Sequence, residues 1–260
     1  MVDDGTRARD LLRSLDELAS TRIDDLEYGT AYFNSELPLV HDRTNFVRVS
    51  AWLGAAGLAG LLQAAEHAQR EAGLLHRKVV FETADEQIAK FLVPMRWEVR
   101  PLTILAYRGE PWAAPAGFQV TELRDEAARD ARSRHLGENP KVRDAETVRQ
   151  LLDEDVLLAQ AGAVRVVAAF DGQVPAAICG LYSHGRTAQL HELSTLESHR
   201  KRGYGRAALA GALHAAAAGH DLVVGLADAG AWQQAWFARL GFEPVGGRTD
   251  ALRVVGATRA

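Results

Sequence analysis

The sequence predicts an α+β protein of two domains. Two regions alternate strand-like runs with segments of helical periodicity, which is typical of this fold class. Between them, residues 108–117 carry two prolines and two glycines without a periodic pattern, so we place the domain boundary there. Of the 260 residues, 47% are apolar and 25% are charged. A globular chain of this size buries roughly 70–75% of its unfolded surface, so its core needs neither a disulfide nor a metal.

The first region begins with a helix near residues 5–20. Runs rich in apolar and β-branched residues predict strands at 27–34, 45–50, 76–82 and 102–107. Apolar residues at helical spacing predict helices at 57–72 and 85–95.

The second region repeats this alternation of strands and helices. The expected strands are 118–123, 164–170, 174–182, 187–195 and 222–227. The expected helices are 125–136, 145–158, 203–218 and 232–240. Asp171 and Gly172 form an Asp-Gly pair between two of these strands, which is a strong signal for a tight hairpin.

The two regions resemble each other at a displacement of 145 or 146 residues. Residues 79–85 align with 224–230, and residues 95–98 align with 240–243. The helices before them match as well, with Gly57 and Gly73 on Gly203 and Gly219. Three matches in the same order indicate a duplicated structural unit.

Charge and composition exclude several classes of protein. Thirty basic and 34 acidic residues give a net charge of −4, which does not favour a nucleic-acid partner. The longest uncharged run, 50–65, is shorter than the roughly 20 residues of a membrane span, and the acidic start is unlike a signal peptide. The single cysteine, Cys179, excludes an internal disulfide and a zinc knuckle. We therefore expect a cytoplasmic protein without membrane partner or metal.

The segment after the predicted strand 187–195 carries the strongest chemical signal. Three basic residues, Arg200, Lys201 and Arg202, precede Gly203 and Gly205, which open a helix. The first N–H groups of a helix have no partner within it, so such a start attracts phosphate. Glycines let a diphosphate approach the backbone closely. The pattern predicts a diphosphate ligand.

A Gly-x-Gly pair before a helix is weak evidence when taken alone. A solvated basic turn at a helix start explains it equally well. No Gly-Lys-Ser/Thr follows, and Ala208 stands where a dinucleotide fingerprint has its third glycine. A protein that binds ATP or NAD on this turn is therefore a minor alternative.

The turn Arg200-x-x-Gly203-x-Gly205 resembles the acyl-CoA signature of the GNAT superfamily of acetyl-CoA-dependent N-acetyltransferases. A second segment, 235–242, is similar to the closing helix and Gly-Phe turn of that superfamily. The resemblance covers 117–256 fully and 20–110 faintly. It implies a mixed, mostly antiparallel sheet flanked by helices, in two tandem copies. The expected domains are a degenerate copy at 1–110, a linker at 111–117 and a complete copy at 118–260.

The resemblance also implies acetyl-CoA as co-substrate. Its pantetheine would bind backbone groups at the end of the strand 187–195, and its diphosphate would bind the amides of the following turn. Leu190 and Leu193 break the two-residue period of this strand, which a β-bulge explains. The expected cofactor-binding residues are Ser194, Thr195, Leu196, Arg200, Lys201, Arg202, Gly203, Tyr204, Gly205 and Arg206.

The implied reaction is direct attack of a primary amine on the acetyl thioester. His191 is our first candidate for the base that removes the amine proton, since an ordinary imidazole titrates near pH 7. Glu192 is the alternate, although its side chain should point to the opposite face unless the bulge turns it. A polar pair within the sheet explains both residues equally well. Phe237 stands where relatives often carry a proton-donating tyrosine.

The expected acceptor is a small-molecule or peptide amine held by the helices 125–136 and 145–158. A non-catalytic acyl-CoA-binding module, acting as a sensor or scaffold, is the alternative, because Phe237 cannot donate a proton. Both hypotheses predict binding of CoA, and only the first predicts turnover. The sequence leaves the oligomeric state open between monomer and homodimer.

Overall fold

The computed structural model describes residues 2–140, 142 and 144–255. It contains two compact units. Unit 1 combines Met1–Leu11 with Ala106–Gly225, and unit 2 combines Leu12–Leu105 with Leu226–Ala260. The C-terminal segment is thus part of unit 2, because its strand β11 (Phe242–Val254) pairs antiparallel with β4 (His76–Phe81). The two units therefore interleave along the chain, unlike the predicted domains 1–110 and 118–260.

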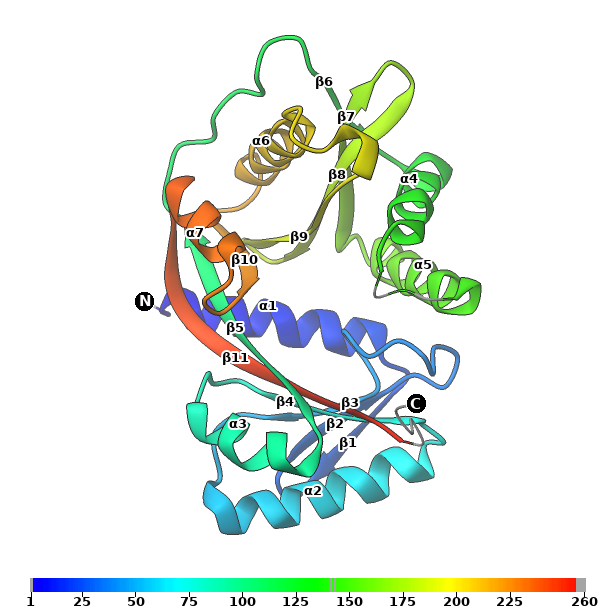
Figure 1. Cartoon of the computed structure of the whole chain (residues 1–260), viewed down its shortest axis with the longest axis vertical. Helices are drawn as coiled ribbons and strands as arrows, with labels where there is room; N and C mark the ends of the chain where they lie inside the picture. The colour runs from blue at the N-terminus through cyan, green and yellow to red at the C-terminus, as the bar shows by residue number, and fades with distance from the viewer. Residues whose placement is uncertain (1, 141, 143, 256–260) are drawn as a thin grey trace. The chain divides into compact units, whose positions relative to one another are not determined.

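Unit 1 is built on a mixed sheet with the strand order β10-β9-β8-β7-β6 (Figure 1). All its pairs are antiparallel except that of β9 with β10. Gly172 has a left-handed φ of 59° at the turn between β7 and β8, which confirms the predicted Asp-Gly hairpin. The strands are β6 (Gln119–Leu123), β7 (Val164–Asp171), β8 (Val174–His184), β9 (Thr187–Thr195) and β10 (Leu222–Asp228).

Helices cover both faces of the sheet in unit 1. Helix α6 (Tyr204–Ala217) packs on one face, and α4 (Asp125–Gly137) and α5 (Ala145–Gln160) lie on the other (Figure 1). Most buried residues of α6 are alanines, and Gly211 lets the helix approach the sheet closely. A Cβ at that position would lie 2.4 Å from Cγ1 of Val120.

Strand β9 carries the β-bulge that the sequence predicts. His191 pairs with Gly180, and Ser194 pairs with Ile178, so two residues of β9 face the single residue Cys179. Glu192 lies in the bulge with a left-handed φ of 45°. The parallel ladder to β10 ends at the pair Leu190 and Gly225, directly before the bulge.

Unit 2 repeats the central motif of unit 1. Its sheet has the order β1-β2-β3-β4-β11-β5, and β3 and β4 are parallel strands joined by α2, as β9 and β10 are joined by α6. This agreement confirms a duplicated fold. The further elements are α1 (Asp4–Ala19), β1 (Arg22–Leu26), β2 (Gly29–Phe33), β3 (Phe46–Val49), α2 (Gly54–Glu71), α3 (Glu86–Leu92), β5 (Glu98–Tyr107) and α7 (Trp232–Arg239).

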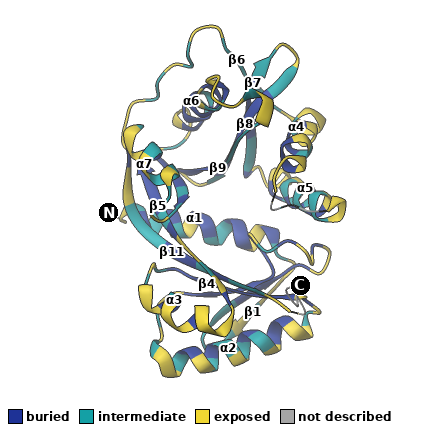
Figure 2. Ribbon diagram, viewed as in Figure 1, coloured by how far each residue is buried: buried dark blue, intermediate teal, exposed yellow. Residues whose placement is uncertain are grey.

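The two faces of the sheet in unit 2 differ in chemistry. Helices α2 and α3 cover an apolar core that includes Val47, Val79 and Phe81. The opposite face carries buried charges, and Figure 2 shows the central strands as buried. Arg48 forms ion pairs there with Asp16 of α1 and, at 2.9 Å, with Glu82. Buried charges are tolerated because they are paired in this way.

The first copy lacks the features that mark β9 in the second. The pairing of β3 with β2 and β4 has no register shift over the described residues, so no bulge interrupts it. The face that corresponds to the bulge side of β9 is filled by the ion pairs of Arg48. No helix among the described residues is long and apolar enough to cross a membrane.

Candidate functional site

The loop from β9 to α6 is shaped by two residues with left-handed backbone. Lys201 has φ 60°, and Gly203, at the N-cap of α6, has φ 94°. Glycine suits position 203 for a second reason, because a Cβ there would lie 2.9 Å from Cζ of Phe118. A Cβ at Gly205 would lie 2.8 Å from the hydroxyl of Thr195. The start of α6 therefore lies directly against the end of β9.

The first turn of α6 presents uncommitted backbone donors. The first hydrogen bond of the helix runs from the N–H of Ala207 to the carbonyl of Gly203, at 3.0 Å. The N–H groups of Tyr204, Gly205 and Arg206 precede it and have no acceptor within the helix. No side chain caps this end. These donors and the positive end of the helix dipole suit an anionic ligand.

The basic residues of the loop differ in what their side chains contact. Arg200 donates to the carbonyl of Thr195 at 3.3 Å. Arg202 pairs with Asp171 at 3.1 Å. Lys201 and Arg206 have no acidic side chain within 4.0 Å among the described residues. Among the described residues, a carboxylate neutralises Arg202 but not Arg200, Lys201 or Arg206, and these three cations suit a phosphate.

The predicted pantetheine contacts at the end of β9 are partly occupied by the protein itself. The N–H of Leu196 donates to Ala176 at 2.9 Å, and its carbonyl accepts from His199 at 2.9 Å. The hydroxyl of Ser194 lies 3.0 Å from Nδ1 of His135. Leu196 therefore offers no unpaired N–H, and the prediction for this residue rests on its remaining carbonyl lone pair.

His135, on α4, fixes the side chain of Ser194. Its Nε2 lies 2.9 Å from the carbonyl of Pro175, which can only accept a proton. Burial lowers the pKa of His135, so the ring is neutral at neutral pH and carries its proton on Nε2. Nδ1 then accepts the hydroxyl proton of Ser194.

The bulge brings His191 and Glu192 together. Oε1 of Glu192 lies 3.4 Å from Nε2 of His191, so the bulge does turn Glu192 away from the face expected of a regular strand. The other carboxylate oxygen of Glu192 pairs with Nη1 of Arg132, on α4. The ring of Tyr182, on β8, lies with its centroid 4.4 Å from that of His191.

Arg132 and Asp155 form an ion pair next to His191 and Glu192. Nη2 of Arg132 lies 2.7 Å from the carboxylate of Asp155, on α5, which also accepts the hydroxyl of Tyr182 at 3.1 Å. Burial opposes the charge on Arg132, but Asp155 outweighs it, and the pKa of the guanidinium is raised. Arg132 therefore stays charged and pairs with the side chain of Glu192. The sequence did not identify Arg132 or Tyr182, because only the tertiary fold brings them to β9.

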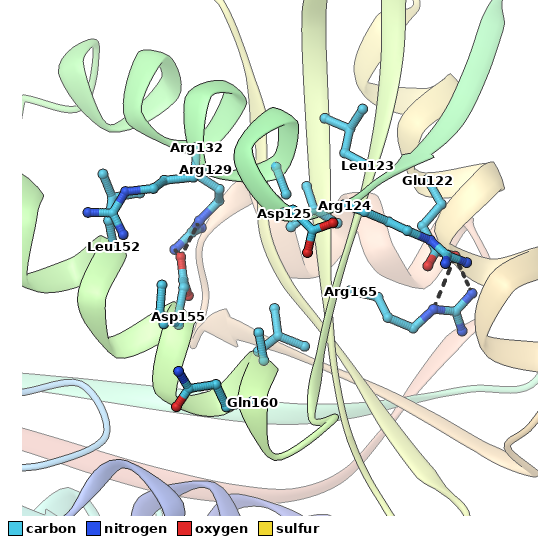
Figure 3. A pocket seen from close by; sticks show the side chains of 15 residues that line it. Glu122, Leu123, Arg124, Asp125, Arg129, Arg132, Leu152, Asp155, Gln160 and Arg165 are labelled. Carbon is cyan, nitrogen blue, oxygen red and sulfur yellow. Dashed lines mark hydrogen bonds and ion pairs between the residues drawn. The ribbon is translucent and has the colours of Figure 1, made fainter.

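A pocket of about 600 Å³ lies between α4, α5 and the strands β6 and β7 (Figure 3). Arg132 and Asp155 line it, and Arg165 pairs with Glu122 on another side. The predicted acceptor helices thus do enclose a pocket. Two acidic residues of α5 are paired with arginines, since Asp155 binds Arg132 and Asp153 binds Arg129 at 3.1 Å. Asp144 caps the helix through the N–H of Thr147.

Phe237 lies in α7 of unit 2. It is buried, with ring centroids 5.1 Å from Trp236 and 4.9 Å from Phe242. Its apolar surroundings match its apolar side chain, so this position offers no proton donor.

We expect Cys179 to resist thiol reagents in the folded protein. The side chain is fully buried, and burial raises the pKa of its thiol to about 12, so the reactive thiolate is absent at neutral pH. Ellman's reagent should label less than about one-tenth of the native protein and all of it in denaturant. Stoichiometric labelling of the native protein would contradict this burial.

Comparison with known proteins assigns this part of the chain to a family. Residues 120–242 match the acetyltransferase (GNAT) family. This region is a GNAT domain. The match includes the bulged strand β9, the glycine turn and α6, which are the elements that the sequence singles out. No group of three or more potential metal ligands occurs among the described residues of the protein.

Solved structures extend the likeness to nearly the whole chain. A functionally unknown conserved protein from Staphylococcus epidermidis ATCC 12228 matches with a TM-score of 0.75 at 11% identity, covering 91% of this chain and 94% of its own. A GCN5-related N-acetyltransferase from Kribbella flavida matches with a TM-score of 0.62 at 20% identity, covering 96% of both chains.

A tandem GNAT protein from the clavulanic acid biosynthesis pathway matches with a TM-score of 0.59 at 15% identity. The alignment covers 98% of this chain and 95% of that protein. At these identities the likeness concerns the fold, and it supports two tandem GNAT copies. No curated protein matches the chain significantly.

Proposed function

We propose that the GNAT domain transfers an acetyl group from acetyl-CoA to a primary amine. The observation that carries this proposal is the uncapped start of α6 beside the bulged strand with His191. The N–H groups of residues 204–206, with Lys201 and Arg206, suit the diphosphate of acetyl-CoA. Thr195, which lies against Gly205, suits the pantetheine end of the same molecule.

In this mechanism His191 removes the proton of the amine. The amine nitrogen bonds to the thioester carbon, the bond from that carbon to sulfur breaks, and the proton passes to the imidazole. Glu192, 3.4 Å from Nε2 of His191, orients the ring and stabilises the imidazolium that forms. Arg132 holds Glu192 in place. A thiol of ordinary acidity, near pKa 8.5, leaves as thiolate near pH 7, so the reaction does not require a donor at Phe237.

Glu192 is then a positioning residue and His191 is the base. We expect Glu192→Gln to lower kcat by about 10- to 100-fold, less than a substitution of His191, with the Kd of acetyl-CoA unchanged. The acidic limb of the kcat profile against pH should move to lower pH, because the imidazolium loses a neighbouring negative charge. A larger loss in Glu192→Gln than in His191→Gln would reverse the two roles.

We propose that the acceptor approaches from the side of α4 and α5. His191 and Glu192 face Arg132 of α4 and the Tyr182–Asp155 pair on that side. Asp153 and Asp155 of α5 are paired with arginines, so these two carboxylates do not favour a polycationic acceptor over a small-molecule or singly charged peptide amine. We propose a cytoplasmic location on the basis of the single, buried cysteine.

A non-catalytic acyl-CoA-binding module is the second candidate, and Phe237 is the observation that favours it. Such a module binds acetyl-CoA on the same glycine turn and releases no thiol with any amine. Release of thiol on addition of an amine therefore separates the two functions.

A further inference from the structure

A single carboxylate from the β7–β8 hairpin contacts two side chains of the turn before α6. Oδ2 of Asp171 lies 3.1 Å from Nη2 of Arg202 and 3.3 Å from Nε2 of His199. The hairpin thus binds the turn at two residues that precede Gly203.

Aromatic rings also pack around the turn. The ring of Tyr204 meets those of Phe118 and His199 edge-on, with centroids 5.0 and 5.6 Å apart. The guanidinium of Arg202 lies over the Tyr204 ring, 5.3 Å from its centroid. Burial and the neighbouring carboxylate of Asp171 raise the pKa of Tyr204, so its hydroxyl stays protonated at neutral pH.

The turn needs such support, because its backbone is unfavourable on its own. Lys201 is not a glycine and yet has φ 60°, a conformation that surrounding contacts must hold. The donors at residues 204–206 point to a common ligand only if this conformation persists. The contacts of Asp171 with His199 and Arg202 help to fix this turn relative to the sheet, together with the bond from Arg200 to the carbonyl of Thr195.

We propose that Asp171 is a positioning residue for the acyl-CoA diphosphate, acting by holding the turn 199–204 in its binding conformation. This inference rests on the proposed function. It also changes the expected role of Arg202, which serves the turn through Asp171 and not by direct contact with phosphate.

Electrostatic repulsion and positioning predict opposite changes in acetyl-CoA affinity when the Asp171 carboxylate is removed, and this makes the proposal testable. A carboxylate near a diphosphate site repels the ligand, so its removal should tighten binding if electrostatics dominate. If positioning dominates, its removal should weaken binding. The variant Asp171→Asn suits this test, because Asn-Gly also forms tight hairpins and the β7–β8 turn is preserved.

We expect Asp171→Asn to raise the Kd of acetyl-CoA, measured by titration calorimetry, by about tenfold. S-acetylpantetheine lacks the diphosphate, so its inhibition constant against acetyl-CoA turnover should not change. Arg202→Gln should weaken acetyl-CoA binding alone but add little in the double variant with Asp171→Asn, since both act through one contact. Arg202→Gln removes the ion pair from its other side and decides the question if Asp171→Asn does not fold; it should weaken acetyl-CoA binding about threefold.

Acetyl-CoA binding as tight as wild type, or tighter, in folded Asp171→Asn would overturn this inference while leaving the proposed function intact. Equal weakening of acetyl-CoA and S-acetylpantetheine would also overturn it, because the effect would then not concern the diphosphate. Absence of acetyl-CoA binding by the wild type would overturn both the proposed function and this inference.

Discussion

Replacement of His191 by glutamine is expected to lower kcat by about 10²- to 10⁴-fold, the usual contribution of a positioned base. Glutamine retains a polar side chain but cannot take the amine proton. The backbone of β9 and the turn before α6 are untouched, so the Kd of acetyl-CoA should stay within about twofold of the wild type. Initial rates of thiol release and titration calorimetry measure the two quantities separately.

His184→Gln is the matched control for this variant. His184 ends β8, is exposed, and lies outside the group formed by His191, Glu192 and Arg132. We expect this control to keep wild-type kcat. A His191→Gln variant with kcat close to the wild type would exclude His191 as the base and leave Glu192 as the candidate.

Replacement of Gly203 by glutamate is expected to weaken acetyl-CoA binding by about 100-fold or more, because three effects act together. The residue has φ 94°, which strains any side chain. A Cβ there would lie 2.9 Å from Cζ of Phe118. The carboxylate also adds negative charge at the helix end that is proposed to bind the diphosphate.

Gly219→Glu adds the same side chain beyond the other end of α6, where a Cβ meets no atom within 4 Å. This control should bind acetyl-CoA as the wild type does. Circular dichroism of both variants checks that the fold is retained. Unchanged affinity in folded Gly203→Glu would mean that the diphosphate does not bind on this turn.

Local sequence signals predicted most elements of the fold. They failed for strands that bury polar residues or that lack an alternating apolar pattern. Strand β9 was predicted with its observed bounds, and its bulge followed from the broken apolar period. Strand β11 was missed, because it contains Pro244 and two glycines and buries Arg248, paired with Asp250 at 2.7 Å. Strand β1, with mostly exposed polar residues, also lacks an apolar period.

The candidate site was likewise predicted only in part from the sequence. His191, Glu192 and the glycine turn lie within one stretch of sequence, and the resemblance to the GNAT superfamily identified them as site residues. Arg132 and Asp171 come from distant elements and meet that stretch only in the fold. The position of Arg132 among the buried residues Ala131, His135 and Leu136 of α4 was a usable signal, since a buried arginine needs a partner. Nothing local predicted that Arg202 pairs with the hairpin.

The most direct test of an acetyltransferase function is the rate of thiol release from acetyl-CoA by the wild type, with and without a panel of primary amines. Ellman's reagent is suitable because Cys179 is buried. We expect thiol release that depends on the amine, saturates with acetyl-CoA and yields one acetylated amine per thiol by mass spectrometry. Saturable binding of acetyl-CoA without thiol release for any amine would contradict it and favour the non-catalytic module.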